Sequence, residues 1–568
     1  MQAISRRSLV KVAGTGFALT GLAASAAAPA AASAAPRSQS PQDAVLFHSG
    51  SVLTMDPACP EASAVLVRGN RIAAVGGNEL RRSAKGARSI DLRGGTLLPG
   101  INDSHFHFAQ YALTRPPLTV DLGAAVTIAQ MQSAIRAAVQ RQPDPESWIK
   151  CFGLDLELFS AAERASLNRR DIDAVAEAHP VAIREASSHI TIVNSRALEL
   201  AGIRGGEDPG VGLDAQGQPT GVLYEAAQNL VNGVVPPYTA EEHRTALAQS
   251  FGQLHRLGLT SYTEPVIGPG MGDGTGLGMD TLAVYLELAR AGKLPMRVDI
   301  QLAPVGQSGG RAAQFQDFLD AWKAPSGIDG RWLRIESVKA FADGLDDPLN
   351  TGGDSPEERR QELFDIARTV HERGFQLGVH VIGPDDTGIT VEALLAAQAQ
   401  NTRPDPRHYL IHGYWIGKDS LRAAAQGGIG LNMQPSFFVR GVPPTVPGRA
   451  LLPYRSALDA GVVAMASSDA PVAAPDWREH VALLATRRNL DGNQTAPEQK
   501  IRLVEALGCY TSRPAWQNRA EQWKGTVSVG KVADLCVLDR NLLRSDPARL
   551  PQAEVVKTMI DGGFVYEA

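Results

Sequence analysis

Two histidines stand one residue apart in the segment LLPGINDSHFHFAQ, residues 97–110, directly after a Pro-Gly turn. The chain holds 12 histidines among 568 residues, so this close spacing needs an explanation. If the segment is extended, successive side chains alternate in direction, and His105 and His107 point to the same side. Two neutral imidazoles on one side can bind a metal cation that neither would hold alone. A pair of surface histidines beside a turn is the alternative interpretation.

Other residues that could bind a metal or move a proton stand within or just after short apolar runs. RIESVKAFADG carries Lys339, QLGVHVIG carries His380, HYLIHG carries His412 and VVAMASSDAP carries Asp469. Each has an ordinary alternative: a core histidine with hydrogen-bond partners, a lysine in a buried salt bridge, or an aspartate that caps a turn. Because these runs deliver nitrogen or oxygen atoms one after another along the chain, we favour one shared site.

The apolar runs alternate with helical segments such as TIAQMQSAIRAAVQRQ and SPEERRQELFDIARTVHERG. Strands that alternate with helices indicate parallel β/α units. There are about eight to ten such runs, including PVAIREASSHI, which is more than a simple open sheet needs. We therefore expect a (β/α)8 barrel with insertions over residues 99–525, with its active site at the carboxyl ends of the strands. The Gly- and Pro-rich segment 205–237 is expected to be an insertion or a long active-site loop.

Both ends of the remaining chain are rich in short β-type runs separated by Gly and Asn turns. DAVLFHSGSVLTM and ASAVLVRGNRIAAVG stand near the start, and GTVSVGKVADLCVLD and VVKTMIDGGFVYEA near the end. We expect them to form one small β-sandwich domain from residues 43–98 and 526–568. The predicted fold class is α/β, a TIM-like barrel with a β-sandwich built from both chain ends.

The first residues indicate export. SRRSLVK contains the pair Arg6-Arg7, and a modest apolar run and an Ala-rich stretch follow. This pattern predicts a twin-arginine-type signal peptide over residues 1–35, with the twin-arginine export machinery as partner and a periplasmic or extracellular location. The run is short and broken by Pro29 and Pro36, which disfavours a membrane anchor. We expect no stable membrane insertion, because no later stretch offers about 18 consecutive apolar residues.

Composition excludes some classes of partner. A formal net charge of −5 gives no sign of a nucleic-acid partner. Hydrophobic residues make up 44% and charged residues 20%, as in ordinary globular proteins. The four cysteines are scattered without CxxC spacing and are expected to be free buried thiols.

The order HxH, Lys, His, His, Asp, framed by a β-domain from both ends, resembles the amidohydrolase superfamily. LLPGINDSHFHF is similar to the family's PGfiDsHxHf motif, and GTVSVGKVADLCVLD is similar to its terminal glycine-rich motif. HITIVNSRALELAGI, VKAFADG and SSDAPV resemble the branch called amidohydrolase family 3, which includes N-substituted formamide deformylases.

The resemblance implies functional roles for His105, His107, His189, Lys339, His380, His412 and Asp469. The HxH pair and Asp469 match the ligands of a first metal, and the later two histidines match those of a second. Lys339 matches a lysine that is carboxylated in many relatives and bridges two metals. His189, in SSHITIVNS, matches a position near the substrate.

Two departures from the family pattern leave the number of metals, one or two, open. Where the branch usually has HAiGDrA, this chain has HVIGPDDTG, with Pro384 in place of the acid. The common motif IEH is LIH here. Both histidines survive, but the residues around them differ.

The implied function is hydrolysis of a C–N bond in a small molecule: an amide, formamide, lactam or cyclic ureide. A divalent metal lowers the pKa of a bound water from about 15.7 to about 7, and Asp469 would carry the proton from this water to the leaving nitrogen. Zinc is the expected metal, with Mn or Fe as alternatives. An esterase or lactonase with the same site is the alternative function. A non-catalytic exported binding protein is disfavoured, because every ligand position is retained. The sequence identifies neither the substrate nor the oligomeric state, and it is compatible with a homo-oligomer.

Overall fold

The computed structural model describes residues 44–568 except 187–188, 207, 273–274, 307–308 and 344–348, all within one compact unit, Pro41–Ala568. The predicted signal peptide, residues 1–35, lies outside the described residues. Among the residues that are described, no helix has both the length and the apolar character needed to cross a membrane.

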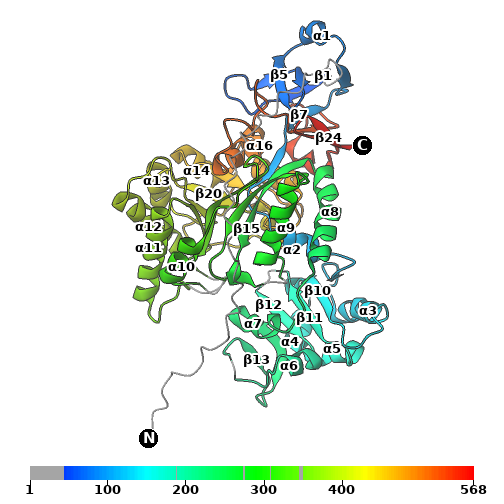
Figure 1. The fold of residues 1–568 in the computed structure, drawn as a ribbon, viewed down its shortest axis with the longest axis vertical. Helices are drawn as coiled ribbons and strands as arrows, with labels where there is room; N and C mark the ends of the chain where they lie inside the picture. Colours follow the sequence, from blue (N-terminus) through cyan, green and yellow to red (C-terminus); the bar gives the residue numbers. More distant parts are fainter. Residues whose placement is uncertain (1–43, 187–188, 207, 273–274, 307–308, 344–348) are drawn as a thin grey trace, which may run out of the picture. The chain divides into compact units, whose positions relative to one another are not determined.

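The central element is a sheet of eight parallel strands that curves into a nearly closed barrel (Figure 1). In order around the barrel its strands are β8 (Ile101–Asp103), β15 (Leu259–Ile267), β16 (Arg297–Leu302), β17 (Leu333–Phe341), β18 (Gln376–Val381), β19 (Tyr409–His412), β20 (Gly430–Met433) and β21 (Ala464–Ala466). Each apolar run that carries a candidate ligand contains one of these strands. The ligand lies either in that strand or in the loop that follows its carboxyl end. The predicted TIM-like barrel is confirmed.

The barrel closes between β8 and β21 through loop contacts. Ser104 Oγ donates to Ala466 O at 3.0 Å, and Asp469 N donates to His105 O at 2.9 Å. The first and last strands therefore end beside each other, as a closed barrel requires.

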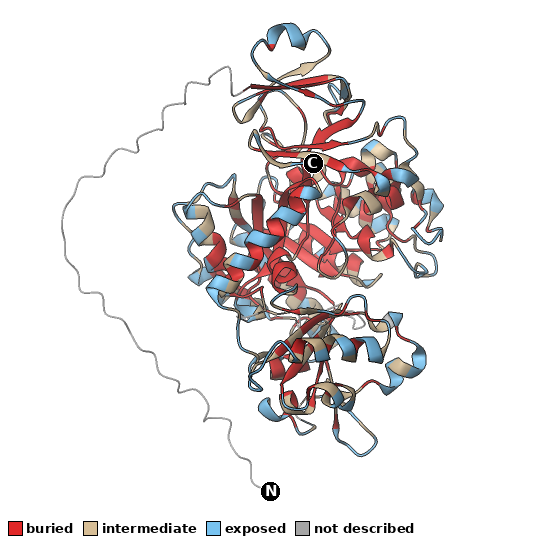
Figure 2. Ribbon diagram, turned by 90° about the vertical axis from the view of Figure 1, so that its right-hand side faces the viewer, coloured by how far each residue is buried: buried red, intermediate tan, exposed pale blue. Residues whose placement is uncertain are grey.

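Helices connect the barrel strands and cover them outside. They are α2 (Phe108–Leu113), α8 (Ala240–Arg256), α9 (Met279–Arg290), α10 (Ala312–Ala321), α11 (Pro356–Glu372), α12 (Asp386–Gln400), α13 (Lys418–Gln426), α14 (Tyr454–Ala460), α15 (Trp477–Thr486), α16 (Leu503–Gly508) and α17 (Ser512–Gln517). Local sequence explains their starts: at α11, Ser355 Oγ accepts from Glu358 N at 3.2 Å and Pro356 occupies the first turn. Figure 2 shows the resulting layering, with buried residues along the barrel strands and exposed residues on the outer faces of the helices.

Strands from the two ends of the described chain form the predicted β-sandwich. One sheet runs β5 (Arg71–Gly76), β4 (Ala64–Arg68), β1 (Ala44–His48), β6 (Arg88–Asp91). The other runs β24 (Gly563–Glu567), β23 (Val555–Ile560), β22 (Leu535–Leu538), β7 (Thr96–Pro99), β2 (Ser51–Leu53), β3 (Glu61–Ala62). A shared apolar core that includes Phe47, Val65 and Val537 lies between them. The short helix α1 (Leu80–Ser83) joins β5 to β6.

A third sheet lies within the chain segment between α2 and α8. Its order is β13 (Val211–Leu213), β14 (Pro219–Tyr224), β12 (Ile190–Val193), β11 (Val181–Glu185), β10 (Ile149–Leu154), β9 (Val120–Asp121). Its helices are α3 (Ile128–Val139), α4 (Ala161–Ser166), α5 (Arg169–Ala176), α6 (Ser195–Leu200) and α7 (Asn229–Asn232). We call residues 120–232 the insertion. It has its own apolar core, which includes Met131, Ile135 and Ile183.

The insertion corrects one sequence prediction. The run PVAIREASSHI was counted among the barrel units, but its strand β11 pairs with β10 and β12 in the insertion. Strands β9, β10 and β11 are parallel and joined through helices, so their local pattern is the same as that of barrel units. The segment 205–237, expected to be an insertion or a loop, contributes β13 and β14 to this sheet.

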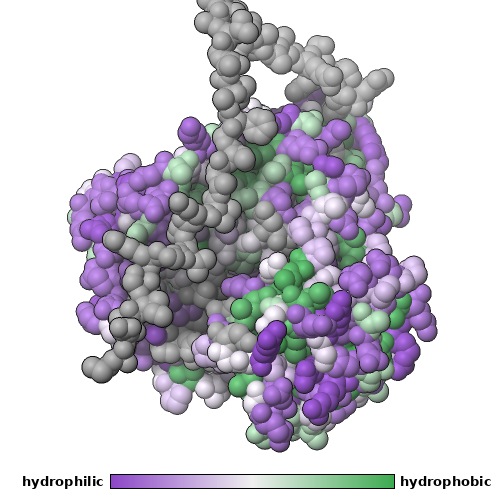
Figure 3. Space-filling model, turned by 60° about the horizontal axis from the view of Figure 1, so that its bottom comes forward, coloured by the Kyte–Doolittle hydropathy of each residue, from purple (hydrophilic) through white to green (hydrophobic). Residues whose placement is uncertain are grey.

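Figure 3 shows one face of the molecule. The described surface that is visible there is mostly hydrophilic, with small hydrophobic groups between the hydrophilic residues.

Candidate metal centre and active site

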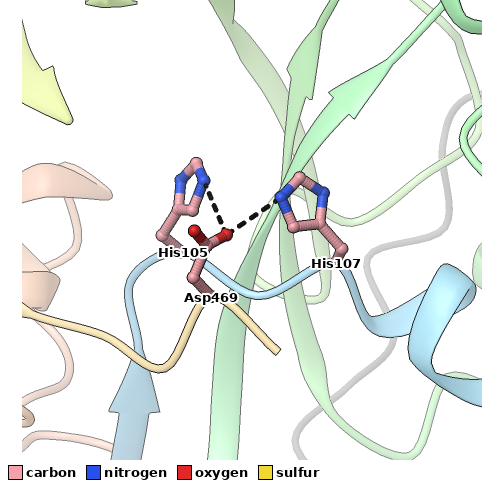
Figure 4. A group of neighbouring side chains, drawn as sticks. All are labelled: His105, His107 and Asp469. Carbon is pink, nitrogen blue, oxygen red and sulfur yellow. Dashed lines mark ion pairs between the residues drawn. The ribbon is translucent and has the colours of Figure 1, made fainter. Parts of the chain in front are cut away.

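Loops at the carboxyl ends of β8 and β21 place His105, His107 and Asp469 together. The Nε2 atoms of His105 and His107 lie 3.4 and 3.0 Å from Oδ1 of Asp469 (Figure 4). One ligand atom from each of the three residues lies within 4.8 Å of the others. The two imidazole rings are nearly perpendicular, with centroids 5.2 Å apart. Two nitrogens and a carboxylate oxygen thus converge on one point.

The two histidines converge for a different reason from the one expected. Strand β8 ends at Asp103, so neither histidine lies in an extended strand. His105 lies in the turn that follows, and His107 is the residue before α2. Between them, Phe106 turns away into an aromatic core against Tyr262, at a centroid distance of 5.9 Å. Packing of Phe106, rather than strand alternation, directs both imidazoles to the same side.

The chemistry of this cluster fits a divalent metal. Burial lowers the pKa of His105 well below its usual value, so its imidazole is neutral and keeps a lone pair. Burial raises the pKa of the Asp469 carboxyl, but the close approach of His107, whose Nε2 lies 3.0 Å away, outweighs burial, and the pKa lies below its usual value. Among the described residues, no donor with hydrogen-bond geometry reaches the buried Oδ1 of Asp469. A cation would satisfy this oxygen, which is costly to bury alone.

His380 and His412 form a second pair beside the first cluster. Nε2 of His412 lies 2.9 Å from Nδ1 of His380, and the rings of His412 and His105 are 6.0 Å apart. Nδ1 of His412 lies 2.7 Å from Oε1 of Gln434, which fixes the ring. Burial lowers the pKa of His412 to about 4 and that of His380 well below its usual value. Both imidazoles are therefore neutral at pH 7.

Lys339 lies on β17 and its side chain is 1% exposed. Its Nζ is 5.0 Å from the centroid of Phe341. Burial lowers its pKa to about 7, although the carboxylate of Asp469 acts in the opposite direction. A lysine in this state is partly a neutral amine at pH 7, which is the form that reacts with carbon dioxide. Glu336, an acid on the same strand that could have formed a salt bridge with this lysine, instead pairs with Arg334 at 2.6 Å.

These residues line one cavity, which we call the catalytic cavity. It has about 750 Å³ of empty space, part of which is open to solvent, and it is lined by all seven positions that the sequence singled out: His105, His107, His189, Lys339, His380, His412 and Asp469. His189 comes from the insertion, and its Nδ1 lies 3.0 Å from the carboxylate of Glu225. Apolar lining comes from Val266, Phe341 and Phe437. The insertion and the barrel therefore build this cavity jointly.

Sequence reasoning assigned no role to Asp103, although the residue stands in the quoted motif. Its Oδ1 accepts from His105 N at 3.3 Å and from Ser468 N at 3.1 Å, so it ties the two ligand loops together. Burial raises its pKa to about 7. Glu264 has a similar place: it accepts from Ala109 N at 3.1 Å and holds the start of α2. Their signal is weak in the sequence because both are single acids within apolar runs.

The HVIGPDDTG segment lacks the usual acid, but a residue that follows another strand places an acid beside His380. Asp343, directly after β17, accepts from Ile382 N at 2.9 Å and from Gly383 N at 2.6 Å. Its Oδ1 lies 3.7 Å from Nε2 of His380. Asp343 therefore supports the backbone next to His380 although Pro384 has replaced the usual acid.

The pentapeptide GQSGG, residues 306–310, has the letters of the G-x-S-x-G elbow of serine hydrolases. That elbow is a sharp turn directly between a strand and a helix, whereas β16 ends at Leu302 and α10 begins only at Ala312. Ser308 lies outside the described residues. The pentapeptide carries no argument for a serine nucleophile.

A parallel eight-stranded barrel with histidines and a carboxylate at the carboxyl ends of its strands defines a class of barrel enzymes built around a metal site. The profile of the Amidohydrolase family matches residues 88–566, and the chain belongs to this family. The resemblance found in the sequence is confirmed, and the protein is a hydrolase.

Relatives and solved structures agree with this assignment. The amidohydrolase YtcJ of Bacillus subtilis is 26% identical over 92% of this chain and 99% of its own. The N-substituted formamide deformylase of Arthrobacter pascens is 27% identical over 91% of this chain and 97% of its own. An uncharacterized metal-dependent hydrolase from Pyrococcus furiosus has the same fold, with a TM-score of 0.65, 21% identity and coverage of 89% and 100% of the two chains.

Proposed function

We propose that this enzyme hydrolyses a C–N bond of a small amide, with formamides among the candidate substrates. The observation that carries the proposal is the convergence of the buried His105 and Asp469 and the half-buried His107 on one point at the mouth of the barrel. The relative named as an N-substituted formamide deformylase supports the bond type. The alternative, an esterase or lactonase, would use the same residues.

In this proposal, His105, His107 and Asp469 hold a divalent metal, with zinc expected from the imidazole and carboxylate ligands. When bound, such a metal supplies a Lewis acid that lowers the pKa of water and polarises a carbonyl. Asp469 accepts the proton of the attacking water. It then delivers the proton to the leaving nitrogen, which must be protonated to depart.

Residues around this point position the substrate and exclude water. The Nδ1 atom of His189 lies 3.0 Å from the Glu225 carboxylate, which orients this imidazole in the lining of the catalytic cavity. Phe437 and Val266 supply an apolar wall. Lys339, once carboxylated, would offer two anionic oxygens beside His380 and His412, enough to complete a second metal site.

Rates on matched substrates test the bond type. We expect the metal-loaded enzyme to hydrolyse N-benzylformamide faster than benzyl formate after subtraction of the uncatalysed rates. Asp469→Asn keeps the shape of the side chain but removes its proton acceptor, and we expect it to lower kcat by at least about 100-fold. Faster ester cleavage would favour the alternative, and unchanged activity of Asp469→Asn would remove the proton-transfer role.

Export by the twin-arginine route, to a periplasmic or extracellular location, is part of the same proposal. It rests on the Arg6-Arg7 pair and the Ala-rich stretch that follows. Replacing both arginines with lysine is expected to retain the precursor in the cytoplasm, as fractionation and immunoblotting would show. Undiminished export of the double variant would contradict this route.

A further inference from the structure

A second cavity adjoins the catalytic cavity. It has about 650 Å³ of empty space, part of which is open to solvent, and it is lined mainly by residues of the insertion, of α2 and of the loop before α8. Gln110 and Arg184 line both cavities. These two side chains therefore lie where the two cavities meet.

Arg184 is a half-buried cation for which the described part of the chain offers no anionic partner. It lies on β11, and its Nη2 donates to Asn232 Oδ1 at 3.2 Å. A guanidinium carries five N–H donors in a planar fork that matches a carboxylate. Removal of the charge from water lowers the pKa of Arg184, and the nearby Tyr238 acts in the opposite direction. A guanidinium that is partly removed from water is stabilised by an anionic partner, and a carboxylate ligand would supply one.

The charges that line the second cavity have one sign. Lys150 is there with Arg184, and no Asp or Glu is among the described lining residues. Nζ of Lys150 donates to Pro236 O at 2.7 Å and lies 3.8 Å from the centroid of Tyr238. Burial lowers the pKa of Lys150 to about 8, so it is mainly charged at pH 7. The catalytic cavity adds one lining carboxylate, Asp469, which belongs to the metal cluster.

We infer that the substrate is an amide that carries a carboxylate, and that Arg184 binds this carboxylate while the scissile bond lies at His105, His107 and Asp469. The inference rests on the proposed function and names its substrate class. The rest of the acid-bearing part extends into the second cavity, where Tyr238 and Asn232 offer polar contacts. Neutral amides of the same size leave the Arg184 charge unpaired and bind less well.

Binding of matched probes tests the inference without turnover. Isothermal titration of the metal-loaded full chain would compare 4-phenylbutanoate with 4-phenylbutanamide. We expect the acid to bind at least about 10-fold more tightly, because charge-assisted pairs with Arg are strong. Arg184→Gln should remove this preference by weakening the acid about 10-fold, while affinity for the amide stays the same. Arg184→Lys should keep part of it, which separates loss of charge from misfolding.

The exposed Arg136 of α3 gives a matched control, since Arg136→Gln removes a cation from the same insertion outside both cavities. It should change neither affinity. Equal binding of acid and amide, or an acid affinity unaffected by Arg184→Gln, would overturn the inference. A carboxylate bound at the metal instead would lose affinity on chelation and not on Arg184→Gln, and this result would also overturn it.

Turnover separates this inference from the proposed function. N-formylphenylalanine and its neutral carboxamide are matched formamides. Hydrolysis of both with the same kcat/KM would support amide hydrolysis and overturn the carboxylate preference. Arg184-dependent binding of 4-phenylbutanoate without hydrolysis of any amide would overturn the proposed function and leave the anion site in place.

Discussion

The backbone at two candidate ligands adopts the left-handed region that favours glycine. The φ angle is 57° at Asp469 and 74° at His412. Such residues cost about 1 kcal/mol or more and persist where neighbours hold them in place. At Asp469 the neighbours are known: its own N–H is bonded to His105 O, and Asp103 holds Ser468 from the other side. At the residue scale, side-chain direction is set by these backbone contacts.

Asp103 therefore offers a test of positioning. Asp103→Ala removes the acceptor shared by His105 N and Ser468 N, and we expect metal affinity to fall by about 10- to 100-fold. Because burial raises the pKa of this carboxyl to about 7, a neutral acceptor of the same shape should serve, and Asp103→Asn should stay close to wild type. Metal titration with a competing chelator measures both. Equal loss in both variants would show that the charge matters and not the acceptor.

Lys339 decides between one metal and two. If it is a carboxylated bridge, Lys339→Ala should lose one bound metal and at least about 100-fold in kcat, and short carboxylic acids such as propionate should partly restore both. Metal analysis by mass spectrometry and rates with and without propionate provide the measurement. Lys339→Arg keeps the charge but forms no stable carbamate, so it should not be rescued. A fully active Lys339→Ala with unchanged metal content would leave a one-metal enzyme.

At the element scale, buried hydrogen bonds attach the barrel helices to the strands that carry the ligands. His408, next to β19, accepts from Leu377 N of β18 at 2.9 Å through Nδ1. This bond leaves its proton on Nε2, which lies 2.8 Å from Nδ1 of His371 on α11. His371 in turn reaches Asn401 O at 2.6 Å after α12. This chain of hydrogen bonds thus joins β18 and β19, the strands that carry His380 and His412, to α11 and the end of α12.

This chain makes stability depend on pH. Burial is the largest cause that lowers the pKa of His408, to about 3, whereas an unfolded histidine has a pKa of about 6.5. As pH falls below about 6.5 the unfolded chain binds the proton first, so His408 destabilises the fold by up to about 1.4 kcal/mol per pH unit. His408→Asn should be less stable than wild type at pH 7.5, and the difference should shrink toward pH 5. Urea unfolding at several pH values measures it; a constant difference would contradict this account.

At the scale of the whole molecule, a buried ion pair joins the barrel to the β-sandwich. Arg297 of β16 donates Nε to Asp534 at 2.7 Å, next to β22, and Nη2 to Asp561 at 2.8 Å, after β23. Arg297 also stacks over Trp332 and Trp523 at 4.6 and 5.2 Å. The carboxyl-terminal part of the β-sandwich is therefore attached to the amino-terminal end of the barrel, opposite the site.

Removing one partner of this pair should be costly. Arg297→Ala leaves the buried Asp534 without its cation, and we expect the free energy of unfolding to fall by about 3–5 kcal/mol. The exposed pair of Arg331 with Asp329 gives a control, since Arg331→Ala should cost less than about 1 kcal/mol. Thermal and urea unfolding would compare the variants. Equal effects of the two substitutions would show that the buried pair has no special role.

The sequence by itself determined the barrel, the sandwich from both ends and the seven lining residues of the catalytic cavity. It could do so because parallel strands share one carboxyl end, so residues at the ends of separate apolar runs must meet. Tertiary structure decided that PVAIREASSHI belongs to the insertion, because β/α units in a barrel and in a separate sheet have the same local pattern. It also decided that His105 and His107 converge through a turn packed on Phe106, that Asp103 links their loop to that of Asp469, and that Arg184 lies half-buried between two cavities. Whether a side chain is buried, and which partners it meets, depends on segments far apart in the chain. The local spacing of residues does not encode these contacts.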